Sequence, residues 1–159
     1  VYKRQNMYLA YETLSEGMKE MLDGLTAIHS ASRAYGERSR VVHSARQSYT
    51  SMKVSTGPDA ETEVEHPVVR THPETGRKGL FVNRAFTVRF KGWTEAESQP
   101  LLDYLYAHAV RPEFTCRFHW ENGSIAFWDN RCTHHFAIND YHGKRRSMHR
   151  VTVCGDRPA

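Results

Sequence analysis

Apolar residues recur at three- and four-residue steps between Tyr8 and Leu25, which predicts an apolar helical face over that stretch. Ser15 followed by Glu16 is typical of a helix N-cap inside the same stretch, so the pattern favours two short helices over one long helix. A second helical region opens at Thr94–Glu97, where the residues form a capping box ahead of a leucine-rich face. We expect this helix to end at Arg111-Pro112.

Alternating apolar and polar residues predict strands from residue 66 onward. The expected strands are Val68–Thr71, Gly79–Val82, Phe86–Phe90, Phe114–Trp120, Ile125–Trp128 and Arg146–Cys154. Asn122-Gly123 favours a hairpin turn that pairs the fourth of these strands with the fifth. Several short strands with peripheral helices predict an α+β fold whose β part is a sandwich or barrel-like sheet.

The segment from Ala31 to Glu65 is polar and carries few large apolar residues. We expect a long excursion with one helix near Arg40–Tyr49. A long irregular segment in a compact domain is often a lid or a functional loop. A solvent-exposed surface segment with no function of its own is an equally good interpretation of this composition.

Composition excludes several classes of protein. The chain has 159 residues, a net charge of +4 and 39% hydrophobic residues, which fits one globular domain. No apolar run approaches the roughly 20 residues of a membrane span, and the first residues do not resemble a secretory signal. Basic residues are scattered except at Lys144–Arg146, so a nucleic-acid partner is not expected. The three cysteines form no Cys-x-x-Cys pair, which favours free thiols and a cytoplasmic location.

The residues with the clearest chemistry lie near the end of the chain. His134 and His135 are adjacent, and since side chains alternate along a strand, at most one of them can face a given metal ion. Arg146 and Arg150 are four residues apart, so a strand would place both on one face. Guanidinium groups suit carboxylate or sulfonate ligands, but the pattern fits a solvated face equally well.

A family resemblance covers the chain from about Asn6 to Arg157. The run Trp128-Asp129-Asn130-Arg131 with Thr133 and His135, continuing to Arg145-Arg146 and Met148-His149-Arg150, closely resembles the C-terminal motif of the taurine dioxygenase family. The stretches Ala10–Ser15, His66–Pro73, Leu80–Asn83 and Phe86-Thr87 match the same family in the same order.

The resemblance implies a double-stranded β-helix (jelly-roll) core with peripheral helices, which holds iron(II) through two histidines and one carboxylate. It assigns His135 to the iron, Arg146 to the cosubstrate α-ketoglutarate (2-oxoglutarate), and Arg150 and Phe86 to the substrate. The implied enzyme is a dioxygenase that uses molecular oxygen to hydroxylate a small anion, taurine or a related sulfonate. Its products would be succinate, carbon dioxide, an aldehyde and sulfite. Members of the family also oxidise alkyl sulfates and aryloxy acids, and the resemblance leaves a homo-oligomer open.

One departure from the family concerns the iron site. The His-x-Asp pair that supplies the other two ligands is absent, and His119-Trp120-Glu121 lies in a strand that the family does not use for iron. Val1–Gln5 lacks the family's cosubstrate-binding threonine, so we expect residues 1–5 to be foreign and residues 6–159 to be an N-terminally truncated dioxygenase domain. The chain alone is then expected to be inactive. The alternatives are an inert anion-binding β-helix protein and a fragment that does not fold stably.

Overall fold

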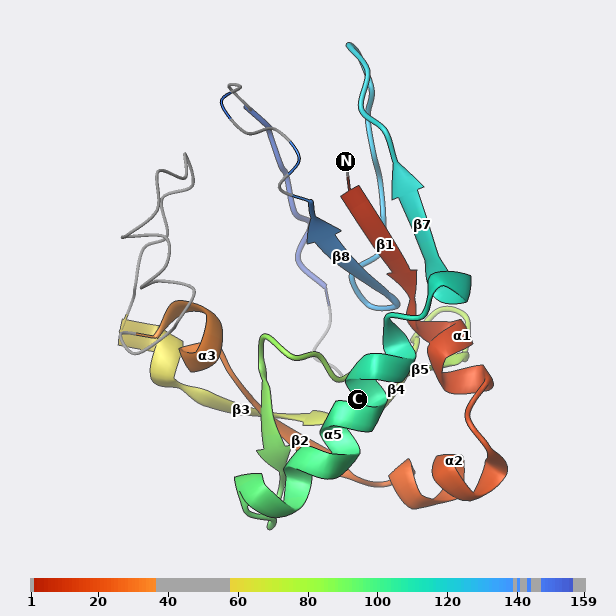
Figure 1. Cartoon of the computed structure of the whole chain (residues 1–159), viewed down its shortest axis with the longest axis vertical. Coiled ribbons are helices and arrows are strands. Elements are labelled where there is room, and N and C mark those ends of the chain that lie inside the picture. The colour runs from red at the N-terminus through yellow and green to blue at the C-terminus, as the bar shows by residue number, and fades with distance from the viewer. Residues whose placement is uncertain (1, 37–57, 139, 141–142, 144–146, 156–159) are drawn as a thin grey trace.

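The computed structural model describes residues 2–36, 58–138, 140, 143 and 147–155. Within these residues, short antiparallel strands form three sheets, and helices pack against them (Figure 1). The mixture of helices and antiparallel sheets agrees with the predicted α+β class.

The first sheet has the strand order β7-β1-β8. Its central strand, β1, is Tyr2–Asn6, flanked by β7 (Thr115–Phe118) and β8 (Thr133–Ala137). Both pairings are antiparallel, with Arg4 opposite Cys116 on one side and His135 on the other. The first five residues, which we expected to be foreign, therefore lie mostly inside the strand that joins the two C-terminal strands.

The other two sheets lie below the first in Figure 1. One has the order β3-β2-β6 and contains β2 (Thr26–Ser30), β3 (Glu63–Pro67) and β6 (Thr87–Phe90). The other is a hairpin of β4 (Val69–Thr71) and β5 (Lys78–Leu80). The hairpin and β6 confirm three of the predicted strands.

Three predicted helices, two before residue 25 and one after Thr94, are confirmed. α1 (Met7–Glu12) and α2 (Glu16–Leu22) are separate, and the Ser15 side chain caps α2 by accepting from the Met18 N–H. α5 (Glu95–Ala109) begins at the predicted capping box, in which Thr94 and Glu97 cap each other reciprocally. Three short elements complete the set: α3 (Ser32–Tyr35), η1 (Pro58–Glu61) and η2 (Pro112–Phe114).

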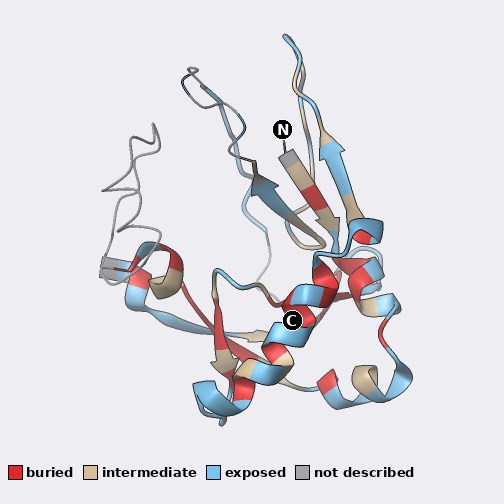
Figure 2. Ribbon diagram, in the orientation of Figure 1, coloured by how far each residue is buried: buried red, intermediate tan, exposed pale blue. Residues whose placement is uncertain are grey.

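The core lies between α1, α5 and the lower strands (Figure 2). Leu102 and Leu105 of α5 are fully buried there, as the leucine pattern predicts. The other buried members of the cluster are Met7, Ala10, Leu14, Leu22, Ala27, Val68, Leu80, Val82, Phe90, Tyr106, Ala109 and Phe114. This core fixes the position from which β1 and β7 project into the upper sheet.

Two strand predictions are wrong. β7 confirms part of the strand at Phe114–Trp120, but residues 125–128 form no strand with it. The described part of the last predicted strand, residues 147–154, also has no strand structure. A strand needs a partner for its backbone N–H and C=O groups, and the described sheets provide no ladder for either segment.

The pattern missed two strands, β2 just before the polar segment and β3 at its end. β2 and β3 pair over five residue pairs, from Thr26–Pro67 to Ser30–Glu63. The helix predicted near Arg40–Tyr49 lies outside the described residues.

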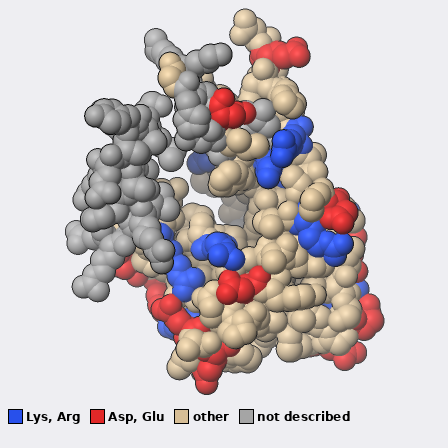
Figure 3. Space-filling view, viewed as in Figure 1, with Lys and Arg blue, Asp and Glu red and all other residues tan. Residues whose placement is uncertain are grey.

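The distribution of charged side chains on the surface agrees with the scattered basic residues of the sequence. Lys and Arg lie among Asp and Glu on the visible face, without a continuous stripe of one sign (Figure 3). In the part of the chain that the structure describes, no helix is long and apolar enough to cross a membrane.

Candidate metal and anion site around β8

Residues 129–132 form the corner that leads into β8, and an ionic network around Asp129 holds this corner in place. The Asp129 carboxylate accepts from Arg131 at 2.6–3.0 Å through Nε and a terminal nitrogen, and His72 Nε2 lies 3.0 Å from Oδ2. Arg131 also donates to Glu74 Oε1 at 2.9 Å. The network therefore ties the turn after β4 to the residues directly ahead of β8.

The tautomer of His72 follows from its neighbours. Its Nδ1 accepts from the backbone N–H groups of Glu74 and Thr75 at 3.2 and 3.3 Å. Nε2 must then carry the proton that it donates to Asp129. The buried ring thus has both nitrogens satisfied, which fixes its orientation.

The same network explains two pKa shifts. Hydrogen bonds from Arg131, and then from His72, hold the pKa of the Asp129 carboxyl well below its usual range. Hydrogen bonds to Asp129 and Glu74 raise the pKa of the Arg131 guanidinium. Asp129 is therefore a permanent anion at neutral pH, and Arg131 is its permanent counterion.

His72, Asp129 and Cys132 are the one group of three potential metal ligands found among the described residues, with ligand atoms within 4.8 Å of one another. However, the Arg131 guanidinium already lies 2.6 Å from Asp129 Oδ2, where a cation would bind. His72 Nε2 donates its proton to the same oxygen, so this nitrogen has no lone pair to offer a metal ion. The arrangement is a salt-bridged anchor for the corner rather than a metal site.

β8 gives its two histidines different surroundings. His135 is exposed and its ring lies 5.3 Å from the Trp128 ring. Arg4, opposite His135 in the ladder, places its guanidinium carbon 3.9 Å from the centroid of Trp128. His134 is less exposed and interacts electrostatically with His29 of β2. This separation matches the expected alternation of side chains along a strand.

Both imidazoles are neutral at neutral pH. Desolvation, with repulsion from His135, lowers the pKa of His134 to about 4. Desolvation also lowers the pKa of His135, followed by repulsion from the Arg4 and Arg150 guanidiniums. A neutral imidazole is the form that binds metal ions, and the two guanidiniums make the surroundings of His135 favourable for anions.

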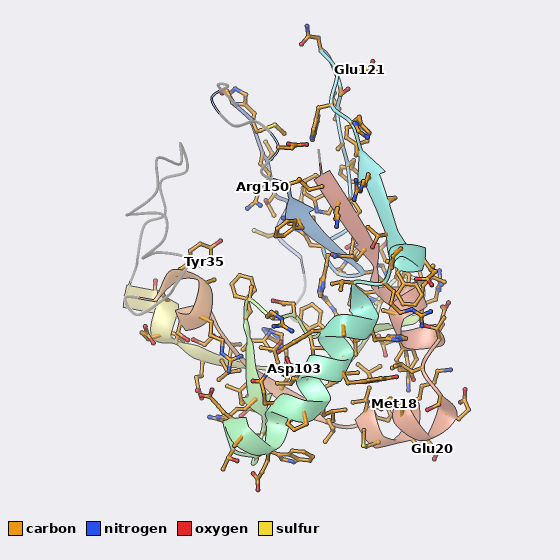
Figure 4. All side chains as sticks on the ribbon, in the orientation of Figure 1. Met18, Glu20, Tyr35, Asp103, Glu121 and Arg150 are labelled. Atoms are coloured by element: carbon orange, nitrogen blue, oxygen red, sulfur yellow. The ribbon has the colours of Figure 1, made fainter. Side chains whose placement is uncertain are left out.

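The predicted arginines have different outcomes. Arg150 is exposed and lies near β8 (Figure 4), close enough for its charge to act on His135. Arg146 lies outside the described residues. The structure therefore places Arg150 within electrostatic range of His135, and the roles of Arg146 and Arg150 stay predictions.

Phe86 lines a cavity beside the β3-β2-β6 sheet. This cavity, of about 460 Å³, is lined by β2 and β3 residues together with Phe86. His29, one of its lining residues, donates to or accepts from Thr87 Oγ1 at 3.2 Å and stacks on Phe81. Burial, with repulsion from His66 and His134, lowers the pKa of His29 to about 4.

The described residues do not complete an iron site. His135 offers a neutral, accessible imidazole, but an iron(II) triad requires a second histidine and a carboxylate. The sequence has no His-x-Asp pair. The group of His72, Asp129 and Cys132 does not include His135. Of the three expected ligands, the family resemblance assigns only His135 to this chain, and that role stays a prediction.

Sequence reasoning did not find the hydrogen-bond partner of His72. Its partner Asp129 is 57 residues away in the chain. The signal that could have found it is the pair of motifs, His66–Pro73 and Trp128–Arg131, that match one family together. Arg4 was missed because it lies in the segment that we expected to be foreign.

Comparison with known proteins decides the family. A model of the family described as "Taurine catabolism dioxygenase TauD, TfdA family" matches residues 5–152. This chain belongs to the TauD/TfdA family. The chain is 40% identical over 153 residues to the α-ketoglutarate-dependent sulfate ester dioxygenase of Pseudomonas putida, a match covering 96% of the chain and 50% of that protein. It is 38% identical to an alkylsulfatase of Acinetobacter baylyi, over 95% of the chain and 46% of the relative.

A solved TauD/TfdA structure is also similar. The taurine dioxygenase of Burkholderia xenovorans superposes with a TM-score of 0.64 at 40% identity, over 84% of this chain and 39% of that one. The chain thus spans about half the length of the curated relatives that it matches. Family membership agrees with the resemblance found in the sequence.

Proposed function

We propose that this chain is part of an iron(II)- and α-ketoglutarate-dependent dioxygenase domain with a jelly-roll core. It hydroxylates a small anionic substrate, taurine or a related sulfonate. The observation that carries this proposal is that His135 of β8 lies within electrostatic range of Arg150, in a segment that matches the TauD/TfdA family. In this account the chain contributes the second histidine and the anion-binding half of the site, while the remaining ligands come from the part of the domain that it does not span.

His135 is proposed as the iron ligand. Its exposed position supports this role, since a ligand must reach a metal that the rest of the domain also contacts. Its lowered pKa keeps the nitrogen lone pair available at neutral pH. The anchored corner at Asp129 holds the start of β8 in place, so that the imidazole presents a fixed direction.

The anion partners are assigned to the two arginines. Arg150 is proposed to bind the sulfonate or sulfate of the substrate, and Arg146 the remote carboxylate of α-ketoglutarate. Planar guanidinium groups bind such anions through two parallel hydrogen bonds. The similarity to a sulfate ester dioxygenase and an alkylsulfatase supports a sulfur oxyanion and includes sulfate esters among the candidates.

Phe86 is proposed to form an apolar wall for the body of the substrate. It lines the 460 Å³ cavity together with His29, whose charge is influenced by His134 of β8. Bound iron would supply oxygen activation. This chain's residues would orient the two anions beside it.

An inert anion-binding protein is the competing function, because the sequence lacks two of the expected ligands. Joining this chain behind the unmatched half of the Pseudomonas putida relative distinguishes the two. The test is succinate release from α-ketoglutarate with iron(II), oxygen and a panel of taurine, other sulfonates, alkyl sulfates and aryloxy acids. We expect stimulation by at least one sulfonate or sulfate ester, whereas release that no compound stimulates would contradict the assigned substrate class.

A further inference from the structure

Phe86 ends a turn that is closed by its own hydrogen bonds. Asn83 Oδ1 accepts from the backbone N–H groups of Ala85 and Phe86 at 3.1 and 3.0 Å. The Thr87 N–H donates to the Asn83 carbonyl at 2.9 Å, and the Thr87 hydroxyl accepts from the Asn83 N–H at 3.0 Å. The shape of the turn is therefore set locally, but its position depends on what holds the residues that follow it.

A β-bulge follows Phe86 directly. β6 pairs with β2 through Thr87 opposite His29 and then through Arg89 opposite Ile28, so the register passes over Val88. Bulges bend the strand and occur often beside active sites, where they redirect a side chain. Thr87 and Val88 are both buried, so their carbonyl groups need hydrogen-bond donors from the protein.

Two side chains from different helices donate to these carbonyl groups. Arg33 of α3 donates from Nη1 to Thr87 O at 3.2 Å and from Nη2 to Val88 O at 3.3 Å. The Tyr106 hydroxyl of α5 donates to Thr87 O at 3.1 Å. Burial raises the pKa of Tyr106 to about 12, so the hydroxyl keeps its proton at neutral pH. Arg33 Nη2 also lies 2.9 Å from Glu95 Oε2 at the start of α5, which directs the guanidinium toward β6.

We infer that Arg33 and Tyr106 are positioning residues for Phe86. By holding the two carbonyl groups directly after Phe86, they fix where its ring stands at the 460 Å³ cavity. The ring of Tyr35, on the same helix as Arg33, lies 6.3 Å from the Phe86 ring, so α3 contacts the turn through a side chain as well. The inference rests on the proposed function, which assigns Phe86 to the substrate. Arg33 and Tyr106 act through Phe86 and do not touch the substrate themselves.

A contribution to stability alone is the competing explanation. Buried hydrogen bonds stabilise a fold wherever they occur, and their loss would then lower the free energy of unfolding without changing substrate affinity. A positioning role predicts in addition a rise in the apparent KM for the substrate at nearly constant kcat. The two explanations therefore differ in a kinetic measurement on folded protein.

Conservative variants of the joined protein, in which this chain follows the unmatched half of the Pseudomonas putida relative, make that measurement. Tyr106→Phe deletes only the hydroxyl, and Tyr104→Phe is its control because Tyr104 is exposed on the same helix. Arg33→Lys keeps the charge but not the paired N–H groups, and Arg89→Lys is its control because the two arginine side chains are similarly exposed, at 31% and 29%.

We expect Tyr106→Phe and Arg33→Lys each to raise the apparent KM about fivefold, the equivalent of one hydrogen bond, for the alkyl sulfate or sulfonate that the parent oxidises best. The kcat and the affinity for α-ketoglutarate should stay within about twofold of the parent. The double variant should show less than the product of the two effects, because both side chains donate to the same Thr87 carbonyl group.

Hydrogen exchange in this chain alone gives a readout that does not depend on activity. The amides of Ala85 and Phe86 should exchange faster in both variants and not in either control. Unchanged exchange, an unchanged KM, or a rise in KM that the controls reproduce would overturn the inference, as would an equal loss of α-ketoglutarate affinity. If the joined parent releases no succinate with any compound, the proposed function fails, and the exchange rates decide whether Arg33 and Tyr106 hold the turn.

Discussion

Adjacent histidines on β8 should differ sharply in their effect on activity. In the chain joined to the missing part of the domain, His135→Ala removes the proposed iron ligand and should abolish iron-dependent succinate release. His134→Ala should retain most of it, because His134 interacts with His29 and not with Arg150. Iron content and succinate release are measured for both variants. Equal losses would mean that the motif does not identify the ligand.

The two arginines should serve different anions. Losing a bidentate contact to a buried anion costs about 2–5 kcal/mol, or roughly 30-fold to several-thousand-fold in affinity. Arg146→Ala should therefore weaken α-ketoglutarate binding, measured without substrate. Arg150→Ala should leave that binding nearly intact, raise the apparent KM for a sulfonate, and release succinate without matching sulfite. Equal damage to α-ketoglutarate binding by both variants would contradict this division.

Burial of His29 predicts a pH-dependent stability. Its pKa is about 4 in the folded state and 6.5 ordinarily, so the unfolded chain takes up the proton first as pH falls. The stabilisation is complete above pH 6.5 and is lost as pH falls toward 4, by up to about 3 kcal/mol. His29→Gln should flatten this part of a plot of urea midpoint against pH. His119→Gln, at an exposed site, should leave the slope unchanged, and an unchanged slope in His29→Gln would refute the assignment.

At the scale of the elements, β8 depends on the corner that precedes it. Asp129→Asn removes the negative charge that binds Arg131 and His72. Hydrogen bonds to charged groups contribute about 1.5–3 kcal/mol each, so we expect a loss of about 2 kcal/mol in the free energy of unfolding. Hydrogen exchange in β8 should also accelerate. Glu113→Gln removes an exposed carboxylate that pairs with Arg111 and serves as the control, with an effect near zero.

The sign of the acid response follows from the same carboxylate. The folded pKa of Asp129 is depressed, so its stabilising effect is present above the ordinary pKa of 3.8 and is lost as pH falls through the folded value. Asp129→Asn should therefore differ from the parent at neutral pH and approach it in strong acid. A difference that grows as pH falls below 4 would mean that the network is not the cause.

Local elements were predictable from the sequence to the extent that their signals are local. The Ser15 cap and the capping box at Thr94 predicted the separate short helices and α5 because each depends on residues three apart. β2 and β3 were missed because their pairing crosses a polar segment with no alternating pattern of its own. The site motif was found through the family resemblance, while the His72–Asp129 bond joins residues too far apart for any local pattern.

At the scale of the whole molecule, the chain spans about half the length of the curated relatives that it matches, and two of its predicted strands are wrong. Residues 125–128 and 147–154 carry strand-like sequences, but the described sheets offer them no ladder. The proposed iron ligand His135 likewise has no His-x-Asp pair beside it in this sequence. An alternating pattern therefore predicts a strand only where another strand is present to pair with it.

Anaerobic titration with iron(II) and α-ketoglutarate tests the central claim most directly, that this chain holds one part of a shared iron site. The visible charge-transfer band of the ternary complex should be absent from the chain alone and present when the chain is joined to the missing half. It should disappear again in the joined protein with His135→Ala. A clear band from the chain alone, or a band that survives His135→Ala, would contradict the account.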